Sequence, residues 1–359
     1  MSLRIGFNTR VSFTSDAGPA AGLREGIDLF TYAESLGYNS GWAYQRHFDH
    51  YLSSPLPFFS AVGQHTSRIT LGTAVLPTRY QEPVLLAEAA ATTDLLVDGR
   101  LQLAVSSGGN NYDEVFGPGP TGLTGRAEGQ RRLGIFLSGI EGKVLHTVTN
   151  DVPTGPPVGT QLRITPYSAG LRSRIWYGSG HIDSAVLAAE QGLRLIVGTI
   201  LHYDTGETFS AYQARLIGEY RKVYKDTHGV DAPPVAVAAS VLPGTTPQLR
   251  AKYAAYDEER RTFGPAASRP KGALAPGKVV ASLLPCPVFH GTPEHVTEAV
   301  LADEGLAAAD ELILFLPPAF GLDENRKLLD DFVTTVAPHL GWEPDEAGAS
   351  HSTEKDTTR

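Results

Sequence analysis

The chain has 359 residues, of which 42% are apolar and 19% charged, with a formal net charge of −9. This composition is typical of a chain that buries a large core, and the acidic balance argues against nucleic acid or an anionic membrane as a partner. The single cysteine, Cys286, excludes an intrachain disulfide. The first residues run into a strand-like pattern without an apolar leader, and no segment approaches the roughly 20 apolar residues that span a bilayer. We therefore expect a cytoplasmic protein.

Short apolar runs alternate with helical patterns along almost the whole chain. The helical patterns lie at 23–37, with Gly37 as its C-terminal stop, and at 83–99, 184–192 and 293–305, the last with Thr292 as N-cap. The apolar runs indicate buried parallel strands at 3–8, 41–44, 68–75, 101–106, 173–178, 193–198, 234–241 and 310–316. Eight such strands predict a single (β/α)₈ TIM barrel over residues 1–342, with an open doubly wound sheet as the alternative.

Two insertions interrupt the alternation, after the fourth and seventh strands. Residues 143–172 are rich in turn formers and predict a small hairpin. Residues 243–290 hold a charged helical piece at 249–263 and a Pro/Gly-rich run. Because this insertion follows a strand, it should lie over the catalytic face of a barrel, where we expect a lid; a linker without a role is the alternative. The polar tail at 343–359 is expected to be disordered.

Three segments resemble the luciferase-like, flavin-dependent monooxygenase family. They are SRITLGTAVLPTRYQEPVLLAEAAATTDLLVDGRLQLAV at 67–105, IWYGSGHIDSAVLAAEQGL at 175–193, and HGTPEHVTEAVL at 290–301 followed by 309–320. The resemblance implies that a separate flavin reductase delivers reduced FMN. The bound flavin would react with O₂ to a C4a-hydroperoxide that oxidises a small organic substrate, such as a biosynthetic intermediate. An enzyme dependent on the deazaflavin F420 and a non-catalytic flavin-binding partner subunit are the alternatives.

A glycine-containing turn is the predicted phosphate site. Tyr177, Gly178, Ser179, Gly180 and His181 end a strand, and Ser184 lies in the first turn of the next helix. Glycines let a backbone approach an anion closely, and the free N–H groups of a helix N-terminus favour negative charge. In the family, the corresponding turn holds the flavin phosphate. His181 either donates to that phosphate or is a solvated turn residue.

Two other strand ends are assigned to the cofactor through the resemblance. Many relatives carry a phosphate-binding arginine where this chain has Ser107, next to Ser106. A serine donates a weaker, neutral hydrogen bond, so we expect weaker flavin binding or a transient cofactor. Thr73, Ala74 and Val75 close the third strand, where the family has a bulge, often with a non-prolyl cis peptide, that props the isoalloxazine ring.

The second strand ends in the predicted catalytic residues. Relatives often have Glu-His-His where this chain reads Gln45-Arg46-His47. An arginine cannot act as a base near neutral pH, but it can bind an anionic substrate or stabilise developing negative charge. The predicted catalytic residues are therefore Arg46, His47 and Tyr44. A salt bridge from Arg46 to one of the insertions is the alternative.

Further strand ends are predicted to contact the substrate at the barrel mouth. These residues are Asn8, Tyr112, His202 and Tyr203. No metal site is expected, because Asp49, His50 and His65 lack the spacing of a metal pair. Apolar helices at 55–67 and 83–97, beside the second and third strands, predict a homodimer.

Overall fold

The computed structural model describes residues 3–13, 18–108, 112–117, 122–123, 125–202, 206–263 and 283–345. Within these residues, parallel strands pair in a ring: β1 pairs with both β2 and β13, and β10 pairs with both β13 and β8. The sheet therefore closes, which confirms the (β/α)₈ barrel and excludes the open sheet. The barrel strands are β1 (Arg4–Thr9), β2 (Ser40–Ala43), β3 (Thr70–Pro77), β4 (Leu101–Ser106), β7 (Ile175–Ser179), β8 (Arg194–Val197), β10 (Val235–Pro243) and β13 (Glu311–Phe315).

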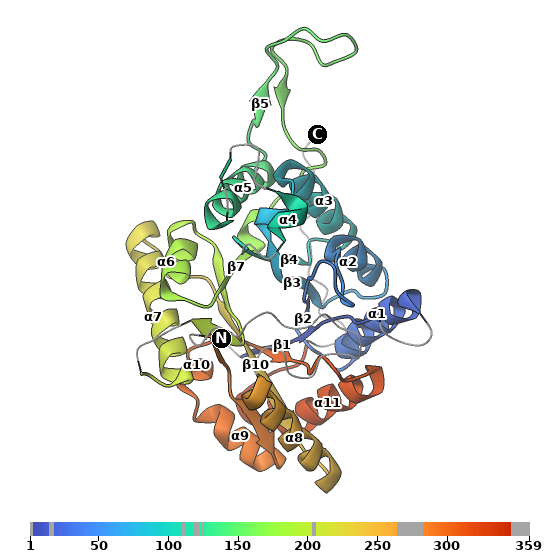
Figure 1. Ribbon diagram of the computed structural model, residues 1–359, viewed down its shortest axis with the longest axis vertical. Helices are drawn as coiled ribbons and strands as arrows, with labels where there is room; N and C mark the ends of the chain where they lie inside the picture. The colour runs from blue at the N-terminus through green and yellow to red at the C-terminus, as the bar shows by residue number, and fades with distance from the viewer. Residues whose placement is uncertain are drawn as a thin grey trace.

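Helices surround the strands on all sides (Figure 1). The predicted helices are present with shifted ends. α1 begins at Pro19 and not at 23, and Gly37, at φ 89°, follows its end as the stop expected from the sequence. Thr292 caps α9 through its side chain, as predicted. The helices are α1 (Pro19–Ser35), α2 (Pro55–Gly63), α3 (Pro83–Leu96), α4 (Asp113–Phe116), α5 (Gly125–Ile140), α6 (Ile182–Glu190), α7 (Phe209–His228), α8 (Pro247–Phe263), α9 (Pro293–Leu301), α10 (Glu304–Ala307) and α11 (Leu322–Thr335).

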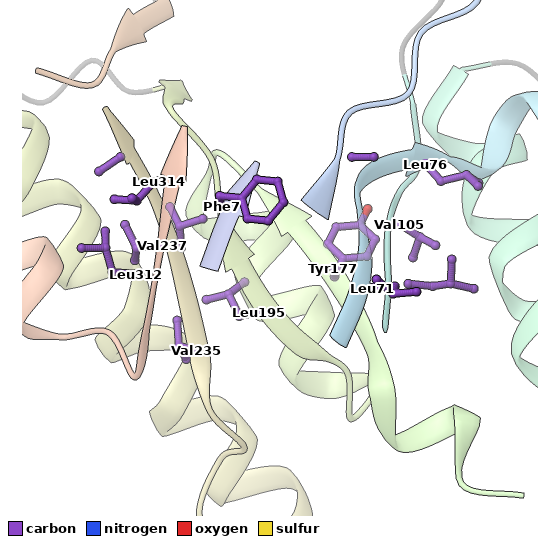
Figure 2. Packing of buried hydrophobic residues seen from close by; sticks show 14 of the residues in the cluster. Phe7, Leu71, Leu76, Val105, Tyr177, Leu195, Val235, Val237, Leu312 and Leu314 are labelled. Carbon is purple, nitrogen blue, oxygen red and sulfur yellow. The ribbon is translucent and has the colours of Figure 1, made fainter. Parts of the chain in front are cut away.

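The barrel has two apolar regions, one on each face of its strands. Side chains such as Phe7, Leu71 and Leu312 belong to the larger cluster, which packs the strands against the helices (Figure 2). A second cluster fills the barrel interior, where the rings of Trp42 and Trp176 meet edge to face with centroids 5.5 Å apart. These tryptophans form a packed floor below the carboxyl ends of the strands.

The first insertion is the predicted hairpin. Strands β5 (His146–Thr147) and β6 (Gln161–Leu162) pair antiparallel, and the hairpin projects away from the barrel beyond α5 (Figure 1).

The second insertion lies, as far as it is described, at the carboxyl ends of the barrel strands. It contributes α8, then β11 (Leu283–Pro285), which pairs with β9 (Ile200–His202) after β8, and β12 (Val288–Gly291), which extends the pairing of β10. This is the position expected of a lid. The Pro/Gly-rich run at 264–282 and the tail from 346 onward fall outside the described residues. No helix in the described part of the chain is long and apolar enough to cross a membrane.

Candidate active site

The mouth of the barrel lies above the tryptophan floor, where TIM-barrel enzymes carry their catalytic groups. Because side chains alternate along a strand, Asn8 and Tyr44 lie on the same strand faces as Gly6 and Trp42, toward the interior. Asn8 is only 5% exposed, and its Oδ1 has no hydrogen-bond partner among the described residues. The mouth therefore holds a buried acceptor that a ligand could satisfy.

A bulge within β3 forms a small apolar shelf at the mouth, and the strand continues beyond the predicted end at Val75 to Pro77. The pairing of β3 with β4 shifts register between Thr73 and Leu76, and the Ala74–Val75 peptide bond is cis. Ala74 and Val75 are half-buried and pack on the interior cluster. A Cβ atom on Gly178 would lie 2.5 Å from Val75 Cγ1, so only glycine fits beside the shelf. The structure thus contains the bulge and the cis bond that the resemblance led us to expect, whereas contact with a flavin ring stays a prediction.

The predicted phosphate turn joins β7 to α6 and is held together by its own side chains. Ser179 Oγ lies 2.7 Å from Ser184 Oγ, and Ser184 Oγ lies 2.7 Å from the carbonyl oxygen of His181, to which it donates. His181 caps α6, because its Nδ1 accepts from the N–H of Asp183 at 3.1 Å. A helix cap is compatible with both alternatives for His181, a donor to the phosphate and a solvated turn residue. A bound phosphate would have to replace the internal contacts of the two serines.

Ser107 lies in a buried network of neutral groups. Its Oγ is 2.7 Å from the hydroxyl of Tyr177, and Gln130 Nε2 on α5 donates to both oxygens, at 3.0 Å to that of Tyr177. Ser107 is 6% exposed and Tyr177 3%. The Ser107 hydroxyl, predicted to be available to a phosphate, is therefore already satisfied within the protein. Gln130 was missed by the sequence analysis because nothing in the α5 pattern distinguishes it from a surface glutamine.

Arg46 forms an ion pair within its own loop. Its Nε lies 2.9 Å from Oδ2 of Asp49, a side chain with 0% exposure. Burial lowers the pKa of the Arg46 guanidinium, but Tyr44, Tyr112 and Asp49 outweigh this effect and leave the pKa raised. Arg46 is thus a permanent cation with a fixed partner. The alternative was a salt bridge from Arg46 to one of the insertions; it is wrong for the described residues of both insertions, because the ion pair of Arg46 is with Asp49.

His47 lies among aromatic rings at the rim of the mouth. The ring centroids of Tyr112 and Phe116 are 6.0 and 5.2 Å from that of His47, and Phe48 and Tyr80 complete the group. The Tyr112 hydroxyl donates to the carbonyl of His47 at 3.1 Å. Burial lowers the pKa of His47, so the imidazole is neutral at pH 7 and able to accept a proton. Burial raises the pKa of Tyr112, which stays protonated.

His202 lies beside the phosphate turn. Its N–H donates to the carbonyl of Gly180 at 2.8 Å, which brings the segment after β8 alongside the turn after β7. Burial and the neighbouring His181 lower the pKa of His202. Its neighbour Tyr203 falls outside the described residues. His202, predicted to contact the substrate, thus contacts the predicted cofactor turn.

The predicted residues therefore gather in two groups on either side of the β3 shelf. One group lines the turn after β7 together with the end of β4, and the other surrounds the end of β2. The first group is Ser106, Ser107, Tyr177, Gly178, Ser179, Gly180, His181, Ser184 and His202; the second is Tyr44, Arg46, His47 and Tyr112.

Comparisons with known proteins bear on this arrangement. Residues 3–310 match the family model described as luciferase-like monooxygenase. A 4-hydroxyprotoasukamycin monooxygenase of Streptomyces nodosus subsp. asukaensis is 31% identical over 117 residues, 32% of each chain. An F420-dependent glucose-6-phosphate dehydrogenase of Kribbella flavida is 34% identical over 117 residues, covering 30% of this chain and 32% of that protein. The chain spans about half the length, or less, of the curated relatives it matches.

A solved structure resembles nearly the whole chain. The oxygenating constituent of 3,6-diketocamphane monooxygenase from Pseudomonas putida, in complex with FMN, superposes with a TM-score of 0.69 at 15% identity. The match covers 94% of this chain and 99% of that one. At this level of identity, the likeness supports the barrel fold alone.

Proposed function

The chain belongs to the luciferase-like monooxygenase family, and we propose that it is a flavin-dependent monooxygenase that uses reduced FMN and O₂ to oxidise a small organic substrate. The observation that carries this proposal is the half-buried Ala74–Val75 shelf above a closed apolar floor, with a glycine turn to one side. When bound, reduced FMN supplies the activation of oxygen.

The residues at the mouth fit such a group. The shelf would support the ring. Gly178 and Gly180 let the turn pack closely against the neighbouring chain, because a Cβ on Gly180 would lie 2.9 Å from the carbonyl oxygen of Ile200. The hydroxyls of Ser179 and Ser184 would bind the phosphate. Since these are neutral donors, we propose that the flavin is held loosely and exchanges with a separate flavin reductase.

The other side of the mouth would exclude water and handle protons. The aromatic group around His47 provides an apolar wall. Neutral His47 is the proposed general base or acid, and Tyr44 is the proposed hydrogen-bond donor to substrate. Tyr112, whose proton goes to the carbonyl of His47, would contact the substrate as an acceptor. Arg46 interacts electrostatically with the two tyrosines and contributes positive charge.

A rapid-mixing experiment tests the proposed function. Protein loaded anaerobically with reduced FMN is mixed with O₂, and flavin absorbance is followed in time. We expect flavin reoxidation to be slower than that of free reduced FMN, because the apolar floor and the aromatic wall would limit water and proton access. Reoxidation at the rate of the free cofactor would contradict the proposal. Rapid reduction of F420 by a substrate, without a response to FMN, would instead make the protein an F420-dependent enzyme.

Restoring the missing cation should strengthen flavin binding. In Ser107→Arg, a guanidinium would replace the Gln130 contact and reach the phosphate, and FMN should bind more tightly by about 1–2 kcal/mol. Equilibrium dialysis measures the effect, with Ser173→Arg at an exposed position near the opposite end of β7 as the control for added charge. Equal affinities of both variants would place the phosphate elsewhere.

We also propose a homodimer, now built on α3. The apolar residues of α2 do not form the surface expected from the sequence, because Phe58 and Phe59 are 6% and 0% exposed and pack in the core. On α3, by contrast, Leu85, Leu95 and Leu96 are 63%, 49% and 52% exposed. Light scattering should give a dimer mass for the unaltered protein and a monomer mass for Leu85→Arg/Leu96→Arg. A monomer mass for the unaltered protein would reject the proposal.

A further inference from the structure

Two arginines meet the ring of Phe315 at the barrel mouth. Phe315 ends β13 and is 7% exposed. The guanidinium carbon of Arg10, which follows β1, lies 5.6 Å from the centroid of this ring. That of Arg260, near the end of α8 in the second insertion, lies 5.7 Å from it. β1 and β13 are neighbours in the barrel, so the two cations occupy one side of the mouth.

Arg260 is a buried cation without a carboxylate partner in the described part of the chain. It is 7% exposed, and its donors reach the Tyr256 hydroxyl at 3.4 Å and Cys286 Sγ at 3.8 Å, while its Nε has no partner there. Burial raises the pKa of both Tyr256 and Cys286, which keeps them neutral. Burying a charge without a counter-ion is costly unless another group neutralises it.

The nearby acidic residues do not supply that group. Asp257 is bound by Arg261 at 2.7 Å and by His290 at 3.3 Å. The sequence at 264–282, which follows α8, contains Arg269, Lys271 and Lys278 but no aspartate or glutamate. This stretch of sequence therefore contains no carboxylate that could pair with Arg260.

Arg10 is likewise held by aromatic rings and not by an acid within the described residues. Its guanidinium carbon lies 4.9 and 5.3 Å from the ring centroids of Tyr44 and Tyr51, and its Nε is buried without a hydrogen-bond partner there. Arg10 also lines a cavity of about 430 Å³ that lies between the loops after β1 and β13 and the helices α1 and α11; Glu25 belongs to its lining and Arg260 does not. This volume leaves room beside Arg10 for the body of a small molecule.

The position of the two arginines separates them from the phosphate turn. In the ring of strands, β4 and β7, which carry Ser107 and Ser179, lie opposite β13 and β1. A flavin whose phosphate occupies that turn would leave the arginine side of the mouth to the substrate. In a chain of net charge −9, this local positive charge would also attract an anion that the rest of the surface repels.

We propose that Arg260, together with Arg10, binds an anionic group of the substrate, whether carboxylate, phosphate or sulfonate. That this anion belongs to a substrate rests on the proposed monooxygenase function; the binding of an anion by Arg260 and Arg10 does not. Guanidinium groups bind such oxyanions through paired, charge-assisted hydrogen bonds. The site thereby selects acidic over neutral molecules of the same shape.

Calorimetric titration at low ionic strength tests this proposal with benzoate, its neutral isostere benzamide, and inorganic sulfate as probes. We expect the unaltered protein to bind benzoate at least tenfold more tightly than benzamide, and to bind sulfate. Arg260→Gln should lose at least tenfold in benzoate affinity and Arg10→Gln should lose part of it. Arg261→Gln, which removes the same charge from the adjacent exposed position, should bind benzoate within about twofold of the unaltered protein. Arg260→Lys keeps the charge with fewer donors, so its benzoate affinity should lie between that of the unaltered protein and that of Arg260→Gln. It replaces Arg260→Gln as the test variant if Arg260→Gln fails to fold.

Equal binding of benzoate and benzamide, or equal losses in the Arg260 and Arg261 variants, would overturn the proposal. The same proteins titrated with reduced FMN separate it from the proposed function. Unchanged FMN affinity in Arg260→Gln supports an anion site apart from the flavin phosphate, and loss of FMN affinity overturns it. If reduced FMN does not bind the unaltered protein, the monooxygenase proposal fails, while the benzoate result still decides the anion site.

Discussion

Replacing Gly72 by alanine should destabilise the barrel by about 3 kcal/mol or more, at the upper end of what overpacking of a core costs. A Cβ atom on Gly72 would lie 2.2 Å from Cε3 of Trp42. The indole cannot move away easily, because it packs on Trp176 and its Nε1 donates to Ser40 Oγ at 2.8 Å. Urea unfolding followed by circular dichroism measures the loss.

Two further variants show whether this clash is the cause. Gly218 lies on the exposed face of α7 with nothing within 4 Å of a built Cβ, so Gly218→Ala should raise stability by about 0.5–1 kcal/mol. Combining Gly72→Ala with Trp42→Leu should remove the clash. The double variant should therefore lose less stability than the sum of the losses in the two single variants. A Gly72→Ala protein as stable as the unaltered one would show that the floor is not packed as described.

Replacing Arg46 by alanine should lower both turnover and stability. Turnover should fall by about 10²–10³-fold, the usual contribution of a positioned cationic donor. The free energy of unfolding should fall by about 2–4 kcal/mol, because the wholly buried side chain of Asp49 loses its counter-ion. Substrate turnover under single-turnover conditions and urea unfolding measure the two effects.

The double variant Arg46→Ala/Asp49→Ala separates the two roles. It removes both charges, so stability should largely recover, while turnover should stay low. Arg215→Ala breaks an exposed ion pair with Glu207 and should cost less than about 1 kcal/mol, with normal turnover. Normal turnover in the double variant would remove Arg46 from the active site and leave it a purely structural residue.

The barrel could be predicted from the sequence because its strands are covered on both faces. Continuous apolar runs such as 101–106 and 234–241 therefore mark the strands directly, and all the predicted strands are present. The short strands β9, β11 and β12 were not predicted, since three or four residues carry no usable periodicity. The prediction that α2 contributes an apolar dimer surface was wrong for a related reason. Apolar character alone does not distinguish a helix face that packs on the core from one that is exposed to a partner.

The candidate site was less predictable than the fold. His47 and Ser107 were singled out through the resemblance to the family, and the barrel accounts for their position because it places every strand end at one mouth. Arg260 was missed because the helix at 249–263 reads as a uniformly charged piece, in which Arg260 and the adjacent Arg261 look alike. Arg260 is buried and has no carboxylate partner among the described residues, whereas Arg261 is exposed and paired with Asp257. These differences arise from tertiary packing and cannot be read from the sequence. Gln130 was missed because its partners, Ser107 and Tyr177, are distant in the chain.

Anaerobic titration with reduced FMN, oxidised FMN and F420, followed by tryptophan fluorescence, tests the central claim most directly. Trp42 and Trp176 form the floor of the proposed flavin site, so a bound flavin should quench their emission. We predict saturable quenching by reduced FMN, weaker binding of oxidised FMN, and little response to F420. Tight binding of F420 with no response to reduced FMN would contradict the proposal that the protein is an FMN-dependent monooxygenase.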